Sequence, residues 1–220
     1  MLFLYELLGF INNFKTNYQI RNGADAMIRQ VFSIFEPNSQ LLYGLTLFVI
    51  FFLIGYKYRQ ILLKGEINIR FLILMIVESF IWCAGLLIIM KGINTLFLAN
   101  PITLNLLEQF YLSIGAGIWE ELIFRLGLIP IFTYIISAVF RYGKSFSVIL
   151  SLLFSGAIFS LFHYVGIYGD IFTWQTFILR TFAGVFLGAV FLFRGLGISV
   201  YTHIFYDMII ISMPVLGLTA

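Results

Sequence analysis

The chain has 220 residues, of which 61% are hydrophobic and 10% are charged, and its formal net charge is +3. Soluble domains are about half apolar and a quarter charged, and a soluble core of this size has no room for so much apolar surface. The composition therefore excludes soluble enzymes and nucleic-acid-binding proteins, and it predicts an integral membrane protein.

The first forty residues differ from the rest of the chain. Residues 1–14 are mostly apolar but carry Glu6, and they lack the basic start and the small-residue cleavage site of a signal peptide. We therefore expect an interfacial helix or a short first span there. Residues 15–40 form the most polar stretch, which predicts an extramembrane connection that is partly helical.

The remaining chain is a series of apolar stretches long enough for membrane helices. These stretches cover residues 41–56, 71–90, 102–140, 145–164, 174–193 and 196–216. A straight helix over 102–140 would be about 58 Å long, about twice the hydrocarbon thickness of a bilayer. We expect it to break near Gly115, Gly117 or Pro130. The sequence thus predicts an all-α fold, a polytopic transmembrane bundle of about six to eight membrane helices.

Several of these apolar stretches contain ionisable residues. Such residues are costly in a membrane and usually face a bundle interior or a cavity. They are Glu78, Glu108, Glu120, Glu121, Arg125, His163, Arg180, His203 and Asp207. Both histidines of the chain are among them, which predicts a buried polar site.

The spacing of the acidic pair at 120–121 assigns different directions to its two members. Neighbouring residues on a helix point about 100° apart, whereas residues four apart share a face. Glu121 and Arg125 are therefore expected to form an ion pair, which leaves Glu120 free to point elsewhere. Two further helices each present a pair of residues on one face at a spacing of four: Phe159 with His163, and His203 with Asp207.

These clusters form three motifs in a fixed order. Residues 120–125 fit EExxxR, residues 159–163 fit FxxxH, and residues 203–207 fit HxxxN/D. Over about residues 105–215 the chain resembles the CAAX prenyl protease and bacteriocin-processing family, also called the CPBP or Abi family. Members of that family are intramembrane glutamic endopeptidases. The resemblance implies that 101–220 form a catalytic transmembrane core, with 1–100 as an N-terminal interfacial segment and the first transmembrane helices.

The resemblance also implies roles for individual residues. Glu120 would activate a water together with His163, and His203 with Asp207 would stabilise the oxyanion or orient the water. Supporting roles would fall to Glu121, Arg125 and Phe159.

The last position departs from the prenyl protease branch, which usually has Asn where this chain has Asp207. An ionised Asp accepts hydrogen bonds but donates none, so Asp207 is expected to accept from His203 and to favour its imidazolium form. Because of this difference, the resemblance supports a prenylated substrate less strongly than it supports protease activity.

The resemblance implies a multi-pass protein of the cell membrane whose partners are the lipid bilayer and a protein or peptide substrate, including one with a lipid anchor. No cofactor and no metal are expected, because HExxH is absent and Cys83 is the one cysteine of the sequence. A metal alternative remains, in which Glu120, His163 and His203 form a His₂Glu zinc set.

A second alternative is a non-catalytic or ion- and proton-coupled membrane protein, including one with a bacteriocin self-immunity role, that uses the same buried polar cluster. The order of the three motifs favours the protease, since a proton relay requires no such order. Glu78 and Glu108 are expected to be structural, and Arg180 to neutralise an acid, with Asp207 as one candidate partner.

Overall fold

The computed structural model describes residues 1–15, 21–35, 37–57, 59, 68–92, 106–166 and 169–215. Over these residues the chain is helical and contains no strand, which confirms the all-α prediction. The helices are α1 (Leu2–Lys15), α2 (Gly23–Ser33), α3 (Ser39–Lys57), α5 (Ile69–Gly92), α6 (Leu106–Glu120), the π-helix η1 (Glu121–Leu128), α7 (Ile129–Ala138), α8 (Lys144–Phe162), α9 (Trp174–Arg194) and α10 (Leu196–Val215).

Five helical stretches among the described residues are long and apolar enough to cross a membrane. They are Ile69–Lys91, Leu106–Ala138, Lys144–Phe162, Trp174–Arg194 and Leu196–Met213. Each coincides with one of the predicted spans. Shorter apolar helical stretches occupy Leu2–Ile11 and Ser39–Ile50, and the polar connection predicted at 15–40 contains α2.

The prediction that 102–140 breaks near Gly115, Gly117 or Pro130 is wrong. Its described part, Leu106–Ala138, is one continuous helical path in which α6 passes through η1 into α7. Pro130 is the second residue of α7, in the first turn after η1 ends, where a missing N–H costs little. The two glycines serve close packing instead: a Cβ on Gly115 would meet Tyr5, and one on Gly117 would meet Ile204.

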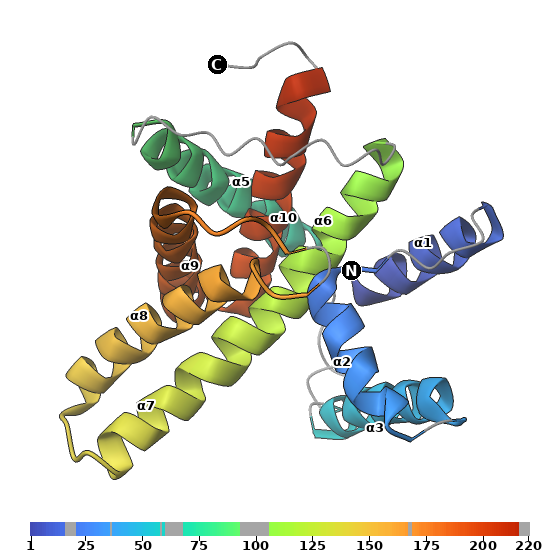
Figure 1. Ribbon diagram of the computed structural model, residues 1–220, viewed down its shortest axis with the longest axis horizontal. Helices are drawn as coiled ribbons and strands as arrows, with labels where there is room; N and C mark the ends of the chain where they lie inside the picture. Colours follow the sequence, from blue (N-terminus) through green and yellow to red (C-terminus); the bar gives the residue numbers. More distant parts are fainter. Residues whose placement is uncertain are drawn as a thin grey trace.

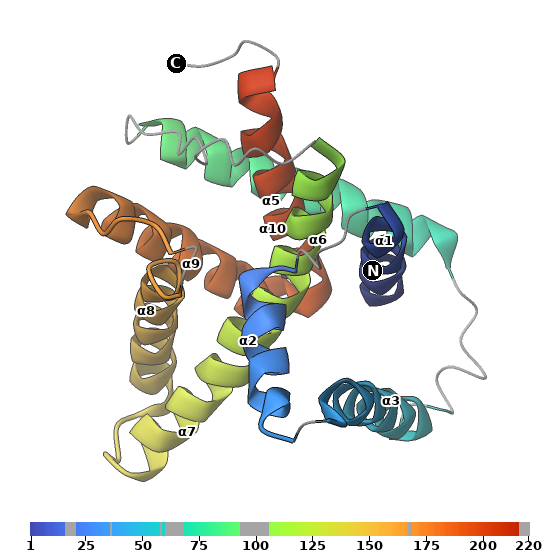
Figure 2. The ribbon, with the colours of Figure 1, turned by 45° about the vertical axis from the view of Figure 1, so that its right-hand side comes forward.

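The α6–η1–α7 path is the central element of the fold. In Figures 1 and 2 it runs as a long rod across the molecule, with α8 and α9 on one side and α1, α2 and α3 on the other. Helix α10 packs against α5, α6 and α9, and both α1 and α2 contact α6. The π-helix therefore lies where α6, α8 and α10 meet, and π-helical turns frequently accompany functional sites.

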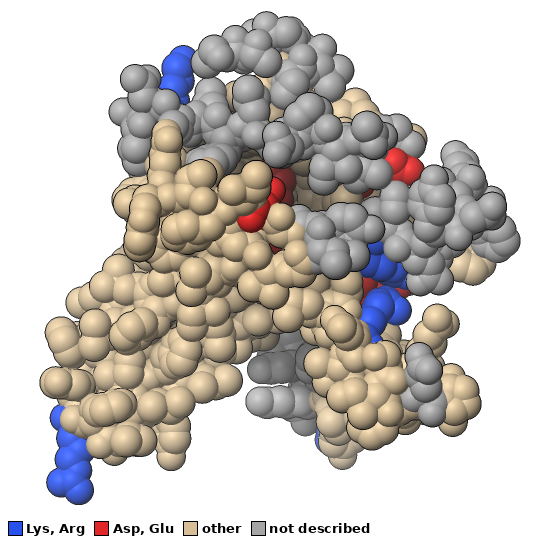
Figure 3. Space-filling model, in the orientation of Figure 1, with Lys and Arg blue, Asp and Glu red and all other residues tan. Residues whose placement is uncertain are grey.

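The outer surface is predominantly apolar. Figure 3 shows uncharged side chains over almost all of α7 and α8, with Lys and Arg at the periphery and beside α1 and α2. Large apolar side chains such as Phe154 and Tyr134 are exposed there, as expected for helices that face lipid.

Candidate active site

The acidic pair lies at the junction between two helix types. Glu120 is the last residue of α6 and Glu121 the first of η1, and both side chains are buried. Glu121 Oε1 lies 3.3 Å from Arg125 Nη1, which confirms the predicted ion pair. Arg125 Nη2 also donates to the carbonyl oxygen of Gly184 on α9, at 3.3 Å.

Glu121 has a second set of partners on α10. Its Oε1 accepts from His203 Nδ1 at 2.9 Å, and its Oε2 accepts from the hydroxyl of Ser199. Sequence reasoning missed Ser199. The available signal was its place four residues before His203 on an apolar helix, which puts both side chains on one face.

The His203 ring is surrounded by carboxylates. Because a carboxylate only accepts, Nδ1 donates to Glu121, and this bond aims Nε2 in the opposite direction. Nε2 lies 3.6 Å from Asp207 Oδ2 and 3.9 Å from Glu120 Oε2. These distances exceed a hydrogen bond, so Nε2 faces both acids without being bonded to either.

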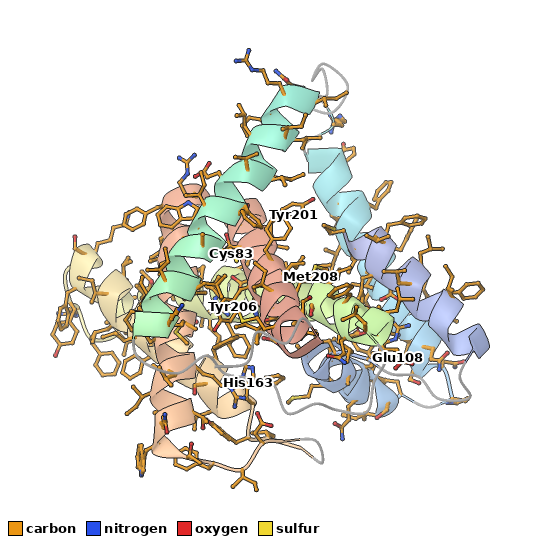
Figure 4. All side chains as sticks on the ribbon, turned by 90° about the horizontal axis from the view of Figure 1, so that it is seen from above. Cys83, Glu108, His163, Tyr201, Tyr206 and Met208 are labelled. Carbon is orange, nitrogen blue, oxygen red and sulfur yellow. The ribbon has the colours of Figure 1, made fainter. Side chains whose placement is uncertain are left out.

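His163 follows the last residue of α8, and a local bond fixes its ring. Its Nδ1 lies 2.9 Å from the carbonyl oxygen of Phe159, and since a carbonyl only accepts, Nδ1 carries a proton. The neutral ring then keeps its lone pair on Nε2. Figure 4 shows His163 where α8 ends. Glu120 is close enough to act electrostatically on this ring.

Phe159 connects the two histidines. Its ring centroid is 4.9 Å from that of His163 and 5.9 Å from that of His203, with edge-on geometry in both pairs. The Arg125 guanidinium lies 4.4 Å from the centroid of the same ring, a distance suited to a cation–π contact. The three sequence motifs therefore converge around one buried aromatic side chain.

A residue outside the motifs also reaches the site. Asn22 caps α2, and its Nδ2 donates to Glu120 Oε1 at 3.3 Å. The two residues are 98 positions apart, so no local sequence pattern could have indicated the contact.

A partly buried polar cluster, formed by Tyr5, Glu6, Arg21, Asp25 and Arg29, joins α1 to α2. Asp25 is fully buried and accepts from the Tyr5 hydroxyl at 3.0 Å and from Arg29 Nε at 2.8 Å. Glu6 accepts from Arg21 and Arg29, each at 3.0 Å. Burial and the neighbouring Asp25 charge raise the pKa of Tyr5 above its usual range, so its hydroxyl stays a donor.

The remaining ionisable residues of the spans lie elsewhere. Arg180 pairs with Asp170 rather than with Asp207, its candidate partner from sequence. Glu78 pairs with Arg194 on the surface between α5 and α9. Figure 4 shows Glu108 beside α1, well apart from His163.

The metal alternative finds no support in the geometry. Among the residues that the structure describes, no group of three or more His, Cys, Asp and Glu side chains is arranged to hold a metal ion. Glu120, His163 and His203 thus do not form a His₂Glu set in this arrangement.

The fold and this centre define a class: a polytopic α-helical protein with a buried site of carboxylates and imidazoles. The model of a protein family described as type II CAAX prenyl endopeptidase Rce1-like matches residues 101–209, a range that contains all three motifs. The chain belongs to this family of CAAX proteases through that range, and it is a multi-pass membrane protein. No curated protein and no solved structure matches the chain.

Proposed function

We propose that the chain is an intramembrane endopeptidase of the glutamic type, which hydrolyses a peptide bond of a membrane-associated protein or peptide. Membership of a protease family supports peptide hydrolysis as the reaction. The observation that carries the assignment of residues is the position of His203 Nε2, which faces both Glu120 and Asp207. A general base and a candidate oxyanion donor therefore lie side by side in a buried site.

Glu120 and His163 activate the water in this proposal. A water between them donates one hydrogen to the Glu120 carboxylate and the other to His163 Nε2, because both atoms are acceptors. Its lone pair then points at the substrate carbonyl. Glu120 takes a proton as the oxygen bonds to the carbonyl carbon, and it returns this proton to the amine when the C–N bond breaks.

His203 stabilises the oxyanion. Its Nδ1 proton is committed to Glu121, so its donor toward substrate is Nε2, and both nitrogens must carry a proton for this role. Asp207 lies beside Nε2 and compensates the positive charge of the imidazolium. Removing one donor from an oxyanion hole typically costs about 100- to 1000-fold in kcat.

Glu121, Arg125 and Phe159 hold this arrangement without reacting. Glu121 fixes the His203 ring, Arg125 balances the Glu121 charge, and Phe159 packs against both imidazoles. We further propose the cell membrane as the location, 101–220 as the catalytic core, and 1–100 as the segment that adds the interfacial and first membrane helices.

The decisive experiment compares the purified wild type with Glu120→Ala on candidate membrane-associated peptides, with and without a prenyl anchor. Cleavage by the wild type alone supports the proposal. Equal cleavage by both forms contradicts the role of Glu120. Cleavage by neither form, with both proteins folded, contradicts an endopeptidase that acts on these peptides.

A further inference from the structure

The two carboxylate oxygens of Glu120 face partners from opposite ends of the chain. Oε2 faces His203 Nε2 of α10, at 3.9 Å, whereas Oε1 accepts from Asn22 Nδ2 at the start of α2, at 3.3 Å. Asn22 lies outside residues 101–209, the range that the family model matches. The contact is therefore a feature of this chain's own N-terminal segment.

The direction of the Asn22 amide is set by its neighbours. Its Oδ1 accepts from the backbone N–H of Ala24 at 2.9 Å, as expected for a helix cap. With the oxygen committed to the cap, the NH₂ group points to Glu120, which fixes the identity of the two amide atoms. One side chain thus performs two separable tasks: it caps α2 through oxygen and binds Glu120 through nitrogen.

The backbone of Asn22 is itself held firmly against α6. Its N–H donates to the Tyr5 hydroxyl at 3.3 Å, and the Tyr5 ring stacks on Tyr111 of α6 with centroids 4.8 Å apart. A Cβ at Gly115 of α6 would lie 2.5 Å from the Tyr5 ring and 2.9 Å from Asn22 Cβ. Only glycine leaves room for this approach, so α1 and α2 are seated on the helix that carries Glu120.

We propose that Asn22 is a positioning residue that acts through Glu120: its amide holds Oε1, so that Oε2, which faces His203, is the oxygen presented to the water between Glu120 and His163. This inference rests on the proposed function, and it extends the active site into the N-terminal segment. A carboxylate that can rotate would spend part of its time with neither oxygen aligned, and loss of alignment lowers kcat rather than substrate binding.

The two tasks of Asn22 allow a test by substitution. Asn22→Ser keeps a good cap but has no amide to reach Glu120, whereas Asn22→Ala loses both the cap and the donor. Both variants should lose about 10- to 100-fold in kcat with KM little changed, the range expected for one hydrogen bond to a charged group. Thr173→Ala, which removes the cap of α9, is the matched control and should keep its activity. If Asn22→Ser kept the kcat of the wild type, Asn22 would serve only as the cap of α2, and the proposal would be overturned.

A second measurement needs no substrate. A hydrophobic carbodiimide labels carboxyl groups in their protonated form, and peptide mapping quantifies the label on Glu120. Because the Asn22 amide occupies Oε1, the carbodiimide should label Glu120 faster in Asn22→Ser than in the wild type at one fixed pH.

The two measurements separate two kinds of failure. Faster labelling of Glu120 in Asn22→Ser, in a protein that cleaves nothing, would contradict the proposed function and still support the Asn22–Glu120 contact. An unchanged labelling rate of Glu120 in a folded Asn22→Ser variant overturns the positioning role, whatever the activity.

Discussion

Glu121 and His203, 82 residues apart in the chain, share a hydrogen bond of 2.9 Å between Oε1 and Nδ1. This bond links the EExxxR motif on η1 to the HxxxD motif on α10. Oε1 of Glu121 thus serves two groups, since it also lies 3.3 Å from Arg125 Nη1. Glu121, which was predicted to pair with Arg125 within one helix, therefore also directs His203 Nε2 toward Glu120.

Glu120 and Glu121 should differ sharply in what their loss does. Glu120→Gln is isosteric but cannot accept a proton, so cleavage should fall by at least about 100-fold while the melting temperature stays close to that of the wild type. The control is Glu108→Gln, a second buried glutamate on α6, which should keep its activity. Cleavage assays compare the purified wild type with Glu120→Gln, Glu121→Gln and Glu108→Gln. Residual activity in Glu120→Gln with loss in Glu121→Gln would exchange the two roles.

Cleavage should not depend on a metal ion. The described His, Cys, Asp and Glu side chains form no metal-holding group, and the proposed base is a carboxylate. Exhaustive dialysis against phenanthroline or EDTA should therefore leave the rate of peptide cleavage unchanged. A loss of activity that zinc alone restores would favour the His₂Glu alternative.

Asp207 should tolerate an amide better than an apolar side chain. Asp207 Oδ2 lies 3.6 Å from His203 Nε2, and an Asn at this position can still accept from the ring or donate to the oxyanion. Asp207→Asn should therefore retain more activity than Asp207→Ala, measured as kcat on one peptide. Equal losses in the two variants would show that the negative charge itself is required.

Local patterns of the sequence predict much of this fold. Apolar length sufficed to place the helices of the spans at 71–90, 145–164, 174–193 and 196–216, because a bilayer of fixed thickness imposes that length. The continuity of α6, η1 and α7 was not predictable in this way. It depends on the π-helical turns and on partners that fill the space beside Gly115 and Gly117.

In the site, too, contacts within one helix were predictable from the sequence, whereas contacts between distant segments were not. Spacing of four residues correctly paired Glu121 with Arg125, since that spacing places two side chains on one helical face. The contacts of Asn22 and Ser199 with the acidic pair join distant parts of the chain. They arise from how α2 and α10 pack on the central rod, which single-sequence spacing does not encode.

Gly115 should be essential for seating the N-terminal helices. A Cβ in Gly115→Ala would come within 2.5 Å of the Tyr5 ring, so the variant must displace α1 or α6, and overpacking of this kind typically costs about 1 to 3 kcal/mol. We expect a lower melting temperature together with lower activity. Gly44→Ala is the control, because nothing lies within 4 Å of its added Cβ. A Gly115→Ala variant as stable and active as Gly44→Ala would contradict the tight seating of α1.

The charges of Arg125 and Glu121 should stabilise the protein as a pair. Both side chains are almost completely buried, so each compensates the cost of burying the other. Arg125→Ala leaves the Glu121 charge without its permanent counter-ion, and breaking a buried pair typically costs about 3 to 5 kcal/mol. Water or snorkelling can relieve part of this penalty in a membrane, so we expect a value near about 3 kcal/mol. Activity should fall as well, because Glu121 directs His203.

The double variant Glu121→Gln with Arg125→Met separates charge from packing. Met fills much of the volume of Arg125, and the amide oxygen of Gln still accepts from His203 Nδ1, so no unpaired charge remains at this position. Its melting temperature should lie well above the value expected from adding the losses of the two single variants. Losses that simply add would mean that the two side chains act independently. In that case the hydrogen bond from His203, rather than the ion pair with Arg125, would be what stabilises the Glu121 carboxylate.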